Sequence, residues 1–125
     1  MAHLTLLIRE ICGDRISTRE DGKPLFERIA AALKEGSTVT VDFDGREIAS
    51  ESFLDEALVE HYIHPVVAEA QKNISLKSVA RPDQALLKRI FDYRKRLEHK
   101  QRQKDIRNSR KAAKDFIEPI QVREP

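Results

Sequence analysis

The chain has 125 residues, of which 40% are hydrophobic and 35% charged, with a formal net charge of +2. This length fits one compact domain that needs no disulfide or metal staple, although the high charged fraction indicates that part of the chain lies outside the core. The single Cys12 excludes an internal disulfide, and no stretch approaches the roughly 20 apolar residues of a membrane span. With no secretion signal in view, we expect a cytoplasmic protein that does not bind membranes.

Strands and helices are predicted to alternate along the first half of the chain. Residues 4–11 form an apolar run of strand formers that a Gly-Asp pair ends. A helix is expected over residues 22–35, with Asp21 as its cap and Pro24 in its first turn, because apolar residues recur there at helical spacing. Residues 38–43 are β-branched and aromatic, which predicts a second strand.

The same alternation continues in the second half. Residues 53–63 have apolar side chains at helical spacing, with Ser52 as the expected cap and Asp55 three residues later as its acidic partner. Residues 74–79 alternate with period two and predict a third strand. A last helix is expected to open at residues 82–83.

The last helix has an apolar stripe that runs from Leu86 to Leu97, and Phe91 and Tyr93 are expected to face the core. Helical structure can continue beyond it, since Lys, Arg and Gln are good helix formers. The tail from Ile117, which contains two prolines, is expected to be extended or disordered. The order of elements thus predicts an α/β domain, a small mainly parallel sheet with flanking helices, over residues 1–97. Residues 98–125 would form a basic C-terminal helical arm and the tail.

Two segments resemble the bacterial STAS-like domain family of unknown function. The stretch Val41–Glu56 has a strand ending in Asp-Phe-x-Gly, a short connector, and then Ser-Phe-x-Asp-Glu on a helix. The upstream Ser17–Gly22 and the order of elements up to about Tyr93 are also similar to the family.

The resemblance implies a function by way of the parent group, named for sulfate transporters and anti-sigma-factor antagonists. That group docks partners through the same strand, loop and helix, and in the antagonists an ATPase-fold serine kinase phosphorylates a Ser at the helix start. The antagonist pattern Asp-Ser-Ser-Gly-Leu falls on residues 50–54, so Ser52 corresponds to the phosphorylatable Ser. This chain differs from the pattern at Ser50, Glu51 and Phe53. The resemblance also implies an ATPase partner related to histidine kinases.

Ser52 has two interpretations, a plain helix cap or a phosphorylation switch. A phosphate there would meet free N–H groups and the positive end of the helix dipole. The surrounding carboxylates would repel it, so its main effect would be to eject an acidic partner. The residues predicted to bind a partner protein are Asp44, Ser50, Glu51, Ser52, Asp55 and Glu56.

No catalytic or metal site is predicted. The acids around the second strand, which include Asp42, are expected to form a solvated rim because no His, Cys or phosphate-binding loop accompanies them. His61 and His64, beside Glu60, lack the i, i+4 spacing of helical zinc sites. Cys12 is expected to be a small buried residue and not a nucleophile. We therefore expect a protein that is not an enzyme and uses no cofactor.

Charge is unevenly distributed, and this suggests a second function. Residues 88–114 hold twelve Lys and Arg against three Asp and Glu, a net charge of +9, which leaves −7 for the rest of the chain. This basic arm could be a solvated helix, could contact nucleic acid without base stacking, or could pair with an acidic surface on a second copy in a homodimer. The candidate nucleic-acid contacts are Arg94, Lys95, Arg96, Lys100, Arg102, Lys104, Arg107, Arg110 and Lys111.

Two functions follow from these patterns. The first is a non-catalytic regulatory module that docks a protein partner through residues 44–56, with Ser52 as its switch. The alternative is a nucleic-acid-binding accessory protein that uses the basic arm, residues 88–114.

Overall fold

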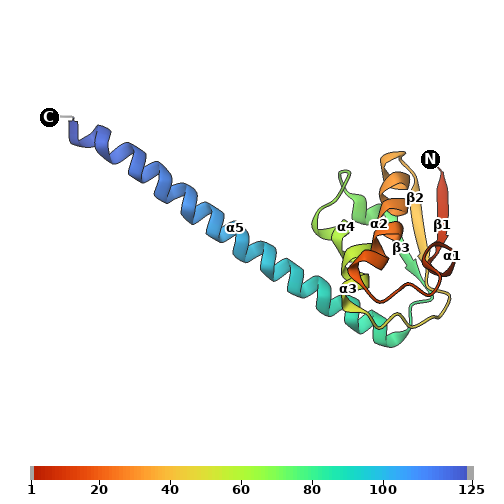
Figure 1. The fold of residues 1–125 in the computed structure, drawn as a ribbon. Coiled ribbons are helices and arrows are strands. Elements are labelled where there is room, and N and C mark those ends of the chain that lie inside the picture. The colour runs from red at the N-terminus through yellow and green to blue at the C-terminus, as the bar shows by residue number, and fades with distance from the viewer. Residues whose placement is uncertain (1, 124–125) are drawn as a thin grey trace. The chain divides into compact units, whose positions relative to one another are not determined.

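The computed structural model describes the backbone of residues 2–123 and the side chains of residues 2–109 (Figure 1). The chain divides into two compact units, Met1–Asp92 and Tyr93–Pro125. The boundary expected between residues 97 and 98 stays a prediction. No helix in the described part of the chain is both long and apolar enough to cross a membrane.

The first unit is built on a three-stranded parallel sheet in the order β1-β2-β3. Leu4 pairs with Val39 in one ladder, and Val39 pairs with Ile74 in the other. The predicted small parallel sheet is therefore confirmed. The strands are β1 (His3–Leu7), β2 (Thr38–Asp42) and β3 (Ile74–Lys77).

Helices pack on one face of this sheet and leave the other face polar. Val39 and Val41 point into the buried layer beneath the helices, as right-handed crossovers between neighbouring parallel strands require. On the opposite face, the Thr40 hydroxyl lies 3.0 Å from Nε2 of His3 and 2.9 Å from the Ser75 hydroxyl. The helices of this unit are α1 (Ile8–Cys12), α2 (Arg19–Lys34), α3 (Glu51–Leu54), η1 (Asp55–Val59), α4 (Glu60–Ile63), η2 (Ala70–Asn73) and the start of α5 (Arg81–Arg123).

The first strand is shorter than the apolar run that predicted it. β1 ends at Leu7, opposite Asp42, the last residue of β2, so later residues have no strand to pair with. The backbone satisfies its hydrogen bonds by turning into α1, which buries Ile8 and Cys12 one helical turn apart. The prediction of strand over residues 8–11 was wrong for this reason.

The second helix begins earlier than predicted, because its cap is Thr18 and not Asp21. The Thr18 hydroxyl accepts the Asp21 amide at 3.1 Å, and the Asp21 carboxylate accepts the Thr18 amide at 3.1 Å, a reciprocal capping box. These bonds lower the pKa of the Asp21 carboxyl. Pro24 consequently lies inside the helix, in its second turn.

Helix α5 carries the second unit, and its backbone is helical through Arg123. The extended tail expected from Ile117 is thus not observed over residues 117–123, while residues 124–125 lie outside the described part. Tyr93 and Leu97 are 55% and 41% exposed, so the core-facing stripe of α5 ends at Phe91, earlier than the sequence indicated. Residues 99–109 are all exposed.

Gly22 is buried where α2 meets the helical run that follows β2. A Cβ on Gly22 would lie 2.9 Å from the Phe53 carbonyl oxygen and 3.2 Å from the Ala57 amide nitrogen. Both neighbours are backbone atoms inside a helix and cannot move independently of it. The two helices can approach this closely only because residue 22 has no side chain.

We therefore predict that Gly22→Ala destabilises the protein, although Ala is the better helix former by about 1 kcal/mol. The steric overlap should lower the free energy of unfolding by about 1–3 kcal/mol, as measured by urea denaturation. Lys23→Ala, at the exposed next position, serves as the control and should change it by less than about 0.5 kcal/mol. A Gly22→Ala protein as stable as the wild type would contradict the close contact.

Candidate functional site

The corner between β2 and the helices α3 and η1, residues 44–56, contains the predicted docking residues, of which Asp44, Glu51 and Ser52 are exposed. Its turn places Asp44 and Gly45 at positive φ, and the Asp42 carboxylate accepts the Asp44 amide at 2.8 Å. The Gly45 amide donates to the Ser78 carbonyl at 3.0 Å. The turn is therefore fastened to the chain that leaves β3, and it is not a free loop.

Ser50, and not Ser52, caps α3, the first helix of this corner. The Ser50 hydroxyl accepts the Phe53 amide at 3.2 Å and donates to the Ser17 carbonyl at 2.6 Å. The helix accordingly starts at Glu51, two residues earlier than predicted. The expectation that Ser52 is the cap is corrected, because Ser50 makes both contacts at once.

Ser52 lies in the first turn of the helix with its side chain exposed, beside exposed Glu51. Its hydroxyl makes no hydrogen bond to any residue that the structure describes. Ser50 caps the helix, so a change at the Ser52 hydroxyl would not remove the capping hydrogen bond.

Asp55, the predicted acidic partner of a Ser52 cap, points inward instead. Its carboxylate lies 2.9 Å from Nη1 of Arg19, which also reaches Glu56 at 3.3 Å. The Asp55 side chain is only 11% exposed, so this pair is better shielded from solvent than a surface ion pair. The hydrogen bond to Asp55 raises the pKa of Arg19 further above its ordinary value.

Of the acids expected to form a solvated rim, Asp44 is exposed, whereas Asp55 is buried. Asp44 pairs with Arg9 at 2.6 Å, and Arg46 pairs with Asp14 at 3.2 Å. Arg9 and Arg19 thus pair with acids of the corner, whereas Arg46 lies in the corner and pairs with an acid outside it. Sequence patterns gave no signal for them, since each lies more than 30 residues from its acidic partner.

Asp83 fixes the chain just before the helix and was missed by sequence reasoning. Its side chain is fully buried, and its two carboxylate oxygens accept the amides of Ile48 at 2.6 Å and Ala49 at 2.8 Å. Ala49 adopts a φ of 52°, which L-residues rarely occupy, and these bonds hold it there. The first turn of α5 thereby sets the angle at which α3 begins.

The histidine pair does not form a metal site. The His61 ring is buried, stacks on Phe26 with centroids 4.2 Å apart, and directs Nε2 to the Phe26 carbonyl, while His64 contacts Glu60. Burial lowers the pKa of His61. No group of three or more His, Cys, Asp and Glu able to hold a metal occurs among the described residues.

Cys12 is buried, as predicted, and burial raises the pKa of its thiol. A raised pKa leaves less of the reactive thiolate at neutral pH. The thiol lies 3.8 Å from the Asp21 carbonyl oxygen, so it packs beside the first turn of α2.

On the second unit, four exposed cations share one face of α5. Arg96, Lys100, Lys104 and Arg107 follow one another at helical spacing of three to four residues. Arg110 and Lys111, which were also predicted contacts, lie outside the residues whose side chains are described. The arm thus presents a cationic stripe.

Comparison with known families agrees with the fold. The profile of the STAS-like domain of unknown function matches residues 21–84, just over half of the chain. The chain therefore belongs to the family of STAS-like domains of unknown function. No curated protein and no solved structure matches it.

Because Asp83 holds Ile48 and Ala49, we predict that Asp83→Ala lowers the free energy of unfolding by about 3 kcal/mol, since the buried Ile48 amide and the part-buried Ala49 amide both lose a charged acceptor. Gln84→Ala, which removes only an exposed side-chain bond to Val79, should cost less than about 1 kcal/mol. Urea denaturation of both variants measures the difference. Equal stabilities would show that the corner does not depend on Asp83.

Proposed function

We propose that this chain is a non-catalytic regulatory module that binds a protein partner through the corner of residues 44–56. The observation that supports this most directly is that two nearby serines have different roles. Ser50 caps the helix and is tied to Ser17, whereas Ser52 is exposed in the first helical turn. A surface whose backbone is held rigidly and whose hydroxyl is exposed is suited to binding a partner, because little conformational freedom is lost on binding.

The partner-facing residues in this proposal are Asp44, Glu51 and Ser52, with Ser50 at the edge of the surface. Asp55 and Glu56 contribute from beneath, through Arg19, by holding the first turn in place. The surface thus offers carboxylates and a hydroxyl at a helix start. A partner ATPase with a basic docking face would fit it, and such an ATPase-fold kinase could phosphorylate Ser52.

Phosphorylation of Ser52 would change binding without unfolding the domain. A negative charge in the first turn is favoured by the helix dipole, typically by 0.3–1 kcal/mol, and Glu51 offsets part of this gain. A phosphate would add bulk to the contact surface, and this steric change, not charge repulsion, would displace a partner that fits the unmodified hydroxyl. The switch would therefore act at the interface.

We predict that Ser52→Asp abolishes partner capture while its free energy of unfolding stays within about 1 kcal/mol of the wild type. The measurement is recovery of the partner from native cells on immobilised chain, with denaturation curves for each variant. Ser52→Ala should retain the partner, and Ser109→Asp, an exposed serine on the arm, is the matched control for added charge.

The switch is refuted if Ser52→Asp and Ser52→Ala both capture the partner like the wild type. The docking surface itself is refuted if Glu51→Arg also has no effect, since that change reverses the charge beside Ser52.

A second candidate function, nucleic-acid binding by the arm, is favoured by the cationic stripe of Arg96, Lys100, Lys104 and Arg107. Neutralising each phosphate releases counterions and steepens the salt dependence of binding by about 0.9 per contact. Replacing these four residues by Gln should therefore reduce the slope of log K against log salt on duplex DNA by about 3–4. Gln at Lys23, Arg28, Lys34 and Lys77 is the matched control, and an equal slope for both variants would exclude the arm.

A further inference from the structure

Strand β3 is an edge of the sheet, with one of its two sides unpaired. Within residues 2–123, whose backbone the structure describes, β3 pairs with β2 alone. The Lys77 carbonyl accepts the Phe43 amide at 3.0 Å, so the backbone groups of Lys77 face β2. Because the N–H and C=O groups of successive strand residues point to alternate sides, those of Ile74 and Leu76 face away from the sheet. They offer a template for another strand.

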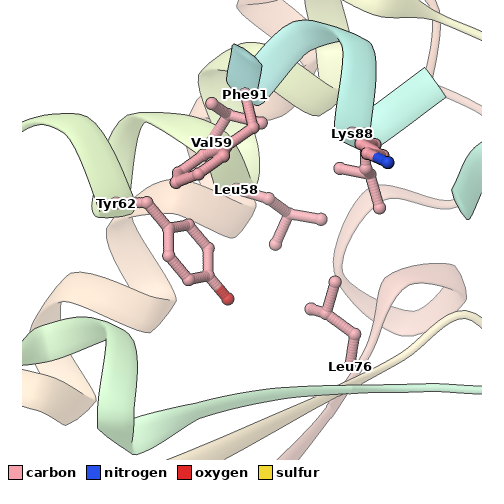
Figure 2. A pocket seen from close by; sticks show the side chains of 7 residues that line it. Leu58, Val59, Tyr62, Leu76, Lys88 and Phe91 are labelled. Carbon is pink, nitrogen blue, oxygen red and sulfur yellow. The ribbon is translucent and has the colours of Figure 1, made fainter. Parts of the chain in front are cut away.

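An apolar cavity of about 250 Å³ adjoins this edge on the helix side of the sheet. Figure 2 shows the Leu58 side chain between Leu76 and Phe91, and the Tyr62 hydroxyl pointing into the open space. Tyr62 and Phe91 meet edge to face, with centroids 5.9 Å apart, which fixes one wall. The apolar lining consists of Leu58, Val59, Tyr62, Leu76, Leu87 and Phe91.

The cavity lies where an inward-pointing side chain of a fourth strand, added beside β3, would be placed. Leu76, Leu87 and Phe91 are only partly buried, although they pack against the core. A strand added to β3 would place alternate side chains on the helix side, over these residues. One large apolar side chain of the added strand would then fill the cavity, and both this side chain and the cavity lining would be removed from water.

The positive charge at the edge of the cavity favours a partner segment that carries an acidic residue. Lys88 is the one charged residue among the seven described residues that line the cavity, and Lys77 is exposed at the end of β3. An acidic residue beside the apolar anchor would meet a cation. An extended segment that carries a basic residue there would be repelled.

We propose that the β3 edge and this cavity bind an extended segment of a partner protein, which adds a fourth strand to the sheet. Main-chain hydrogen bonds to Ile74 and Leu76 provide affinity, an apolar anchor fills the cavity, and an adjacent Asp or Glu contacts Lys88. This surface is separate from the Ser52 corner, so the inference holds whether or not the proposed function is right.

The test uses the full chain, labelled with ¹⁵N, and an array of synthetic nine-residue peptides with alternating Thr and Val. The central anchor is varied among Leu, Ile, Phe and Asn, and the residue two positions later among Glu, Gln and Lys. We expect the amide resonances of Ile74 and Leu76 to shift and their exchange to slow. Peptides with an apolar anchor and Glu should bind at least tenfold more tightly than those with Asn or Lys.

Two further arms separate this mode from general hydrophobic binding. Peptides methylated on the amide nitrogens that would pair with β3 should lose binding at least tenfold, a loss that cannot come from an unfolded variant. Lys88→Glu should reverse the preference from Glu to Lys peptides, whereas Arg28→Glu on α2, with the same change of charge, should not.

The proposal is overturned if no peptide shifts Ile74 or Leu76, or if the anchor and the methylation make no difference. It is also overturned if these two amides are already protected in the free chain by self-association, because a second copy would then occupy the edge.

Discussion

The arrangement of the first unit depends on one close contact, the approach of the start of α2 to the start of the helical run after β2. Gly22 lets the Phe53 carbonyl come to a distance that no side chain would permit. Two polar contacts flank this point, the Ser50 hydroxyl on the Ser17 carbonyl and Arg19 on Asp55. The segments that carry the family resemblance, Ser17–Gly22 and Val41–Glu56, therefore meet in space.

This contact explains why an exposed serine can occupy the helix start. The cap and the buried Asp83 carboxylate satisfy the Ile48, Ala49 and Phe53 amides, and the internal ion pair satisfies the Asp55 carboxylate. The π-helical turn η1 follows directly and allows three consecutive residues, 57–59, to be buried. With the backbone held from three sides, a change of charge at Ser52 would alter the exposed surface more than the stability of the fold.

Local sequence patterns predicted the parts of the fold that local interactions determine. The sheet strands, the long α2 and the parallel topology follow from periodicity and from β-branched runs such as residues 38–43. Element ends were harder, because they depend on partners elsewhere. β1 stops where β2 has no further residue to pair with it, and the helix after β2 starts at Ser50 because Ser17 and Asp83 hold the chain there.

The candidate site shows the same division. Its position at the strand–loop–helix corner and the exposure of Glu51 were accessible from the motif. The inward turn of Asp55 and the ion pairs of Arg9, Arg19 and Arg46 were not, since each pair joins residues far apart in sequence. The cavity beside β3 likewise arises from four separate elements, and no single window of sequence contains it.

The central claim is that the corner is a fixed part of the domain and presents Glu51 and Ser52 on a rigid base. Native-state hydrogen exchange of the Ile48, Ala49 and Phe53 amides tests it most directly. If the claim holds, these three amides exchange as slowly as the buried amides of β2, because all of them exchange only through global unfolding. Exchange that is much faster there, while β2 stays protected, would show that the corner opens on its own and would contradict the account.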